Sequence, residues 1–203
     1  MADESALPRT RWAAGAANSN YLNRFSERID AGEDVDGEAR LADVLVGRGA
    51  RILDAGAGMG RVGIALQRKG HDVLAAEPDE SLVAACRQRW PELPVVVKDI
   101  LELDPATEGS FDLIVVVGNV MILLAEGTEV RALRALRRLL RPGGRILVGY
   151  HLEGGPAGSR HGYTQDLLTA DAEAAGLVVE HRFGGYNLEP VNDDYCVAVL
   201  TAG

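Results

Sequence analysis

From residue 51 onwards, the hydrophobic and polar positions of the chain alternate between two patterns. Short runs rich in Val, Ile and Leu alternate with segments in which apolar residues recur at helical spacing. The runs predict strands at residues 51–55, 72–76, 95–98, 112–117, 144–150, 177–183 and 195–201. The helical spacing predicts helices at residues 61–69, 80–89, 129–140 and 165–175.

This alternation predicts an α/β fold with a mostly parallel sheet. The first five strands are almost continuously apolar, which is typical of strands covered by helices on both faces. The last two strands are joined by a polar loop of only about ten residues, so they are expected to form an antiparallel hairpin.

The first 36 residues have a different pattern. Their apolar positions are loosely spaced as in a helix, and a polar break follows at residues 31–36 before a helix predicted at residues 37–46. We therefore expect an N-terminal helical arm at residues 1–36 and a single domain at residues 37–203. The length of 203 residues, with 47% of them hydrophobic, agrees with one domain that has a proper core.

The chain is acidic, with 21 Lys and Arg against 30 Asp and Glu and a net charge of −9. Duplex nucleic acids and anionic membranes require a dense cationic surface, so neither is expected as the main partner. The arginine-rich helix predicted at residues 129–140 is interpreted as a solvated helix face, although a nucleic-acid contact is an alternative.

Two observations bear on the compartment. No apolar run approaches the length of a membrane span, and the first residues lack a hydrophobic signal core. Cys86 and Cys196 lie in apolar runs and are expected to be small buried side chains rather than a disulfide pair. We expect a cytoplasmic protein, either a monomer or a homodimer.

The strongest chemical signal is the segment ILDAGAGMGR at residues 52–61. Three alternating glycines follow a buried strand and precede a helix, so the backbone can turn tightly and let a ligand approach without a Cβ in the way. A tight turn without a ligand is the alternative. Glu77 ends the next strand about 20 residues later, where a carboxylate can accept hydrogen bonds from both hydroxyls of a ribose.

A second nucleotide-binding interpretation stays open. Residues 58–63 also fit the dinucleotide fingerprint G-x-G-x-x-G, which would indicate an NAD(P)-dependent oxidoreductase. Asp54 speaks against it, because an acid directly before the glycines repels a pyrophosphate and tolerates a cationic ligand. The two lysines, Lys69 and Lys98, also form no Tyr-x-x-x-Lys pair.

These motifs together resemble the class I methyltransferases that use S-adenosylmethionine. The resemblance covers residues 40–201: the Asp-x-Gly-x-Gly-x-Gly loop at residues 54–60, an acid after each of the next two strands, Phe-Asp-Leu-Ile at residues 111–114 and the Arg-Pro-Gly-Gly turn at residues 141–144. It implies a Rossmann-like, doubly wound, seven-stranded sheet in three αβα layers, with an antiparallel last strand. It also implies a methyltransferase that produces S-adenosylhomocysteine and needs no metal.

The resemblance also implies which residues bind the cofactor. Glu77 would hold the ribose, Asp99 would meet the adenine amino group beside Ile100, and Gly118 and Asn119 would border the methionine end. In the arm, Tyr21 and Arg24, with Phe25, would close over the cofactor carboxylate, or the aromatics would simply pack. The remaining cofactor positions are in or beside the glycine loop and after the second strand: Asp54, Ala55, Gly56, Ala57, Gly58, Gly60, Arg61 and Pro78.

The acceptor is expected at the carboxyl ends of the parallel strands, where open α/β sheets bind ligands. His151 leaves the fifth strand there and is the candidate base, with Asn119 beside the reacting atoms; a solvated or half-buried histidine is the alternative. The glycine-rich residues 154–162 are either a lid or a flexible connector. Candidate substrate contacts are Tyr150, Arg160, His161, Tyr186, Asn187 and Asp193.

The segment after the fourth strand argues against one class of acceptor. It reads Asn-Val-Met-Ile, without the two prolines and the aromatic residue found in enzymes that methylate base amines of DNA. A small-molecule acceptor is therefore favoured. A non-catalytic module that binds S-adenosylmethionine is a further alternative, because it needs the same glycine loop and acids.

Overall fold

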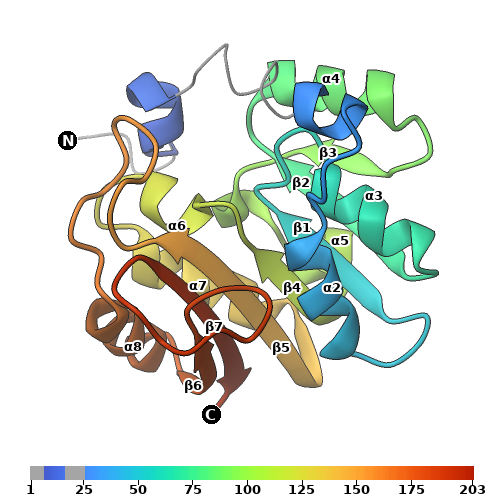
Figure 1. Cartoon of the computed structure of the whole chain (residues 1–203). Helices are drawn as coiled ribbons and strands as arrows, with labels where there is room; N and C mark the ends of the chain where they lie inside the picture. Colours follow the sequence, from blue (N-terminus) through green and yellow to red (C-terminus); the bar gives the residue numbers. More distant parts are fainter. Residues whose placement is uncertain (1–6, 17–25) are drawn as a thin grey trace.

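The computed structural model describes residues 7–16 and 26–203, so the predictions for Tyr21, Arg24 and Phe25 lie outside the described residues. One seven-stranded sheet runs through the molecule in the order β3-β2-β1-β4-β5-β7-β6 (Figure 1). The strands are β1 (Arg51–Ala55), β2 (Asp72–Glu77), β3 (Val95–Val97), β4 (Phe111–Val116), β5 (Leu140–His151), β6 (Leu177–Phe183) and β7 (Tyr195–Ala202).

The topology confirms the predicted fold. Strands β1 to β5 pair in parallel, and β7 lies antiparallel between β5 and β6. The helices whose bounds lie within the described residues are η1 (Trp12–Ala16), α2 (Gly37–Val44), α3 (Arg61–Arg68), α4 (Glu80–Arg89), η2 (Ile100–Glu102), α5 (Pro105–Glu108), α6 (Val120–Leu123), α7 (Glu129–Arg138) and α8 (Gln165–Ala174).

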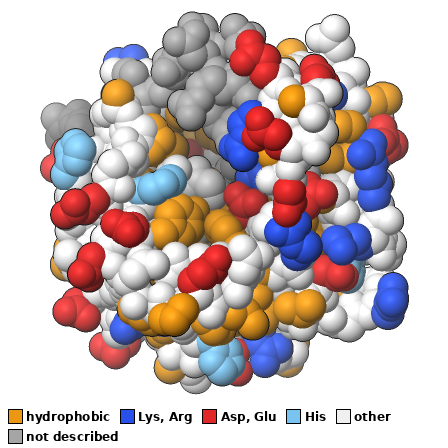
Figure 2. Space-filling model, in the orientation of Figure 1, with side chains coloured by type: hydrophobic (Ala, Val, Ile, Leu, Met, Phe, Trp, Pro, Cys, Tyr) orange, Lys and Arg blue, Asp and Glu red, His pale blue; other side chains and the backbone are white. Residues whose placement is uncertain are grey.

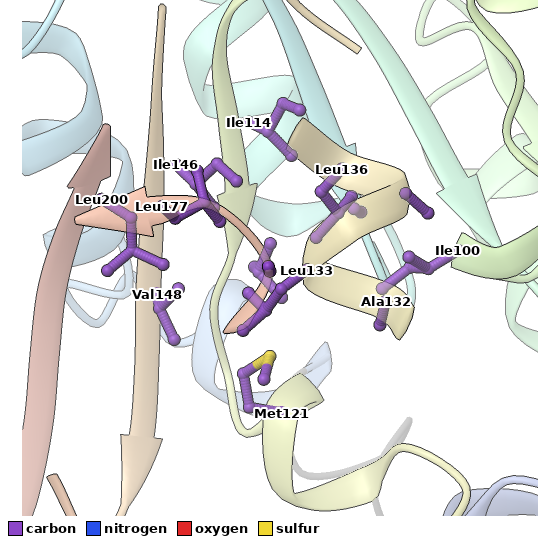
Figure 3. Close-up of a cluster of buried hydrophobic side chains, with 14 of the residues drawn as sticks. Ile100, Ile114, Met121, Ala132, Leu133, Leu136, Ile146, Val148, Leu177 and Leu200 are labelled. Carbon is purple, nitrogen blue, oxygen red and sulfur yellow. The ribbon is translucent and has the colours of Figure 1, made fainter. Parts of the chain in front are cut away.

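Two hydrophobic clusters, one on each face of the sheet, form the core. Helices α6, α7 and α8 cover one face, and α2, α3 and α4 cover the other (Figure 1). In the first cluster, Leu133 and Leu136 of α7 pack over Ile114 of β4 and Ile146 of β5 (Figure 3). Burying apolar surface on both faces explains why these strands are apolar throughout rather than alternating.

The structure differs from the predicted elements in β5. The segment predicted as a turn, residues 141–144, lies inside this strand as an irregularity: Leu140 pairs with Phe111, and the ladder resumes only at Arg145 opposite Leu113. Gly143 and Gly144 therefore lie within β5, at the irregularity in the ladder, instead of separating two elements. The short helices η2, α5 and α6 were not predicted, because each is too short to show a period.

Candidate active site

The glycine loop between β1 and α3 is shaped by left-handed backbone. Gly56, Gly58 and Gly60 have φ angles of 81°, 56° and 81°. A Cβ on Gly56 would lie 2.5 Å from Cγ2 of Val120, and a Cβ on Gly60 would lie 2.6 Å from the sulfur of Cys86. Glycine is therefore required both for the turn and for the close approach of α6 and α4.

The buried carboxylate of Asp54 connects β1 to the start of α3, on either side of this loop. Its Oδ2 accepts a hydrogen bond of 2.8 Å from the amide of Gly63, in the first turn of α3. Gly63 permits this contact, since a Cβ there would lie 3.1 Å from the same oxygen. Burial raises the pKa of Asp54 to about 7, although the Gly63 amide and the Arg61 charge oppose the rise.

Glu77 joins the glycine loop to the end of β2. One carboxylate oxygen accepts from the amide of Gly58 at 2.9 Å, and the other accepts from the amide of Asp79 at 3.0 Å. Burial raises the pKa of Glu77, and these two amides partly offset the rise. A carboxylate can accept about four hydrogen bonds, so each oxygen keeps a lone pair for a ligand.

Asp99 follows β3 at the same edge of the sheet. Its Oδ1 accepts from the amide of Leu101 at 2.8 Å and caps η2, which begins with the buried residue Ile100. Burial raises the pKa of Asp99. The structure thus brings the acids after β2 and β3 to one edge, beside the glycine loop.

These elements enclose a cleft, which we call the glycine-loop cleft. It holds about 620 Å³ of empty space, part of it open to solvent. Its walls include these residues with predicted cofactor roles: Gly56, Gly58, Glu77, Pro78, Asp99, Ile100 and Gly118. The other lining residues were not predicted: Thr10, Trp12, Leu82, Val120, Leu123 and Leu124.

Several residues that were predicted to bind the cofactor are not among the described residues that line this cleft. Asp54 and Ala55 are buried under the loop, and Arg61 forms a two-pronged ion pair with Glu38 of α2, at 2.6 and 2.9 Å. Ala57, Gly60 and Asn119 are also not among the described residues that line the cleft. Asp54 and Gly60 thus shape the loop rather than line the cleft.

Asn119 and His151 are brought together at the ends of β4 and β5. Asn119, with a left-handed φ of 81°, accepts at Oδ1 from the His151 amide at 2.9 Å and lies 3.0 Å from His151 Nδ1. An amide oxygen only accepts, so Nδ1 carries the proton and Nε2 keeps its lone pair. Burial lowers the pKa of His151 below its ordinary value of 6.5, so the ring is neutral at pH 7.

A second cavity, which we call the His151 pocket, opens beside this histidine. The Tyr195 ring meets the His151 ring edge-on, with centroids 4.7 Å apart, and the Tyr186 hydroxyl lies 3.0 Å from that of Tyr195. The other residues of the pocket are mostly polar and come from residues 28–40, from the first residue of α3 and from the β6–β7 loop: Arg28, Asp34, Val35, Gly37, Glu38, Arg40, Arg61, Gly185, Asn187 and Glu189.

The glycine-loop cleft and the His151 pocket share a wall. The backbone amide of Gly118, which lines the cleft, faces the hydroxyl of Tyr186, which lines the pocket. A Cβ on Gly149 would overlap that hydroxyl, so Gly149 of β5 makes the room for it. Figure 2 shows hydrophobic side chains gathered near the centre of this face, where the surface is hollowed, with charges of both signs around them.

The predicted substrate contacts divide between several places. Tyr150 was predicted to contact the substrate, but its side chain is 0% exposed and packs against Tyr163 in the core. It points to the sheet face opposite its neighbour His151, because adjacent strand residues point to opposite faces. Arg160 binds Glu129 at 2.7 Å. His161 and Asp193 line a separate polar cavity between the β5–α8 loop and α8.

Two negative findings concern residues 7–16 and 26–203. No group of three or more His, Cys, Asp or Glu side chains in this part of the chain is placed to hold a metal ion. None of its helices is both long and apolar enough to cross a membrane.

Comparison with known proteins identifies the family. The profile of a methyltransferase domain family matches residues 52–144. A TehB-like S-adenosylmethionine-dependent methyltransferase from Corynebacterium glutamicum superposes with a TM-score of 0.81 and 38% sequence identity, over 94% of this chain and 99% of that one.

Two curated proteins are similar over shorter lengths. The demethylmenaquinone methyltransferase of Beutenbergia cavernae is 34% identical over 49% of this chain, and the ubiquinone biosynthesis O-methyltransferase of Xanthomonas oryzae is 28% identical over 68% of it. The matched part of this chain spans 40% and 64% of their respective lengths. These similarities decide between the two nucleotide-binding predictions in favour of methyl transfer. The chain therefore belongs to the class I methyltransferases, enzymes that use S-adenosylmethionine to methylate an acceptor.

Proposed function

We propose that S-adenosylmethionine binds in the glycine-loop cleft and that a small-molecule acceptor binds in the His151 pocket. The cofactor supplies a methyl group on a positively charged sulfur, which is a good leaving group. The observation that carries the proposal is the shared wall at Gly118 and Tyr186, because the cleft lined by the glycine loop and Glu77 there adjoins a histidine held as a neutral base.

The cleft suits the adenosine half of this cofactor. Glu77 keeps one lone pair on each oxygen after bonding to Gly58 and Asp79, which matches the two hydroxyls of a ribose. Asp99 offers an acceptor for an exocyclic amine. Pro78, Leu82 and Ile100 supply apolar walls for a flat ring. The glycines let the methionine part approach the backbone closely.

His151 acts as the general base in this proposal. Its Nε2 takes the proton that the acceptor's oxygen or nitrogen loses as that atom bonds to the methyl carbon. The bond from the methyl carbon to sulfur breaks in the same step, and the sulfur keeps the electron pair. Asn119 holds the ring in the tautomer that leaves Nε2 free, and Tyr195 fixes its tilt.

The acceptor class follows from the pocket and from the relatives. The His151 pocket combines two tyrosine hydroxyls with paired Arg and acid side chains, which suits a polar small molecule with a removable proton. The two curated relatives described above have names that refer to menaquinone and ubiquinone, which are small molecules. The net charge of −9 disfavours a duplex nucleic acid or anionic membrane as partner. We place the enzyme in the cytoplasm, a reducing compartment in which free cysteines such as Cys86 and Cys196 persist, and we propose a monomer or homodimer.

Turnover measurements test this proposal. S-adenosylhomocysteine formation is followed by mass spectrometry over a panel of small phenols, alcohols and amines. With the best acceptor, His151→Asn is expected to lower kcat by about a hundredfold or more and to leave cofactor affinity unchanged. The exposed His181 provides the matched control, His181→Asn, with wild-type kcat.

The pH profile adds a second test. Because burial lowers the pKa of His151, kcat should rise with pH below 6.5 and be level at pH 7 and above. Wild-type kcat in His151→Asn, with a loss in His161→Asn instead, would contradict the proposal and place the acceptor in the cavity beside α8.

A further inference from the structure

We infer that Glu129 is a positioning residue that latches the N-terminal segment over the cofactor cleft and ties it to the loop after β5. The inference rests on the proposed cofactor site. It adds a link between that site and the loop after β5 that neither the fold nor the glycine motif requires.

The N-terminal segment forms part of the cleft itself. Thr10 and Trp12 line it together with Pro78 and Leu82, although they lie far from these residues in sequence. The indole Nε1 of Trp12 donates to Oδ2 of Asp79 at 2.8 Å. Burial opposes ionisation there, but hydrogen bonds from Ser81 and Trp12 outweigh it and hold the pKa of Asp79 below its usual range.

Arg11 fastens this segment on its other side. Its Nη1 donates to the carbonyl of Leu124 at 2.7 Å and lies 3.5 Å from Oε1 of Glu129, the first residue of α7. Leu124 also lines the cleft, so the contact joins the N-terminal segment to the opposite wall. The Glu129 side chain is only 4% exposed, which makes its carboxylate dependent on cationic partners.

The second partner of Glu129 comes from the loop after β5, which lines the cavity beside α8. Nη1 of Arg160, in the loop after β5, reaches the same oxygen of Glu129 at 2.7 Å. The amide of Arg160 donates to the carbonyl of Ile122 in α6 at 2.8 Å, and its guanidinium lies over the Tyr163 ring. In Figure 1 the blue N-terminal segment and the orange loop lie side by side, in agreement with these contacts.

One buried carboxylate thus holds two segments that border two different cavities. Removing its charge releases both guanidinium groups, and removing either Arg leaves the carboxylate short of a partner. The segment with Trp12 and the loop with Arg160 should therefore loosen together. Arg160 is not among the described residues that line the cleft. We nevertheless expect its substitution to lower cofactor affinity, because it acts through Glu129.

Calorimetric titration of the full chain with S-adenosylmethionine tests the latch. Glu129→Gln and Arg160→Ala are each expected to raise Kd roughly 5- to 50-fold. Arg11→Leu serves as a second variant outside the core, and thermal melting shows that each variant is folded. The exposed Glu126, three residues away, provides the matched control Glu126→Gln, with wild-type Kd.

The emission of Trp12 gives a readout that lost stability alone would not change. Cofactor-free protein is measured in a Trp90→Phe background, which leaves Trp12 as the one tryptophan of the chain. Glu129→Gln should shift its emission to the red and raise its quenching by acrylamide, since the indole leaves the cleft wall.

The outcomes separate the latch from the proposed cofactor site. Wild-type Kd and wild-type Trp12 emission in folded Glu129→Gln and Arg11→Leu, with binding lost in Glu77→Gln, would overturn the latch alone. If the wild-type chain does not bind S-adenosylmethionine, the proposed site fails and the latch fails with it.

Discussion

At the scale of single residues, the buried acids Asp54 and Glu77 have different roles at the cleft. Glu77 lines the cleft and keeps lone pairs for a ligand, whereas Asp54 accepts a hydrogen bond from the amide of Gly63 and acts on the cofactor through its charge. The two acids should therefore respond differently to substitution and to pH.

Glu77→Gln should weaken S-adenosylmethionine binding by at least about tenfold, because a hydrogen bond to a charged group contributes about 1.5–3 kcal/mol. The amide also presents an N–H group to an amide of Gly58 or Asp79 that needs an acceptor. Calorimetry measures Kd, and Glu80→Gln on the exposed side of α4 is the matched control. Equal affinities in Glu77→Gln and wild type would remove the ribose role.

Asp54 should make cofactor binding depend on pH. Its pKa of about 7 leaves the carboxyl partly protonated at neutral pH, and the positive sulfur of the cofactor lowers that pKa. Binding at pH 7 should then release protons, and affinity should rise as pH increases through 7. Titrations in buffers of different ionisation enthalpy count the protons. Asp54→Asn should lose this release, and an unchanged count in that variant would assign the protons elsewhere.

At the scale of elements, the turn from β1 into α3 depends on glycine for two separable reasons. Gly56→Ala introduces a strained left-handed residue, costing about 1–2 kcal/mol, and an overlap with Val120, costing about 1–3 kcal/mol more. Gly70, which follows α3, has a φ of 93° with open space around it, so Gly70→Ala carries the strain alone.

Urea unfolding measures the difference between these two variants. We expect Gly56→Ala to lose more free energy of unfolding than Gly70→Ala and to bind the cofactor poorly, because the overlap pushes α6 away from the cleft. Equal losses in both variants, with wild-type cofactor affinity, would contradict a close fit between the loop and α6.

Sequence patterns predicted the elements that bury the most apolar surface and missed those fixed by tertiary contacts. The seven strands were predicted because each is a run rich in apolar residues, and the long helices because their apolar residues recur at helical spacing. Helix α6 has only four residues, yet it supplies Val120 and Leu123 to the cleft. Trp12 resembled any apolar helix position, since its partner Asp79 becomes its neighbour only in the folded chain.

The candidate site divides in the same way. Acids at strand ends were predictable because parallel strands bring their carboxyl ends to one edge of the sheet. The contact between Asn119 and His151 follows from the same rule, since β4 and β5 are neighbours. The burial of Tyr150 was missed because adjacent strand residues point to opposite faces, and the sequence does not show which face holds α8.

At the scale of the whole molecule, we predict that residues 1–36 are an arm that the core of the domain does not require. Among the described residues, the first member of the two hydrophobic clusters along the chain is Ala39 in one and Leu53 in the other. A chain that starts at residue 37 should therefore unfold cooperatively with Tm lower by only a few degrees, while its cofactor affinity falls because Thr10 and Trp12 are gone. Calorimetric melting and titration measure both quantities. A chain that no longer melts cooperatively would show that the arm belongs to the core.

The most direct test of the account is a crystal structure with S-adenosylhomocysteine bound. We predict density in the glycine-loop cleft, with both ribose hydroxyls within hydrogen-bond distance of the Glu77 carboxylate, the adenine between Leu82 and Ile100, and the sulfur at the Gly118 end, facing the His151 pocket. Density for the ligand outside this cleft, or inside it with the sulfur turned away from Gly118, would contradict the account.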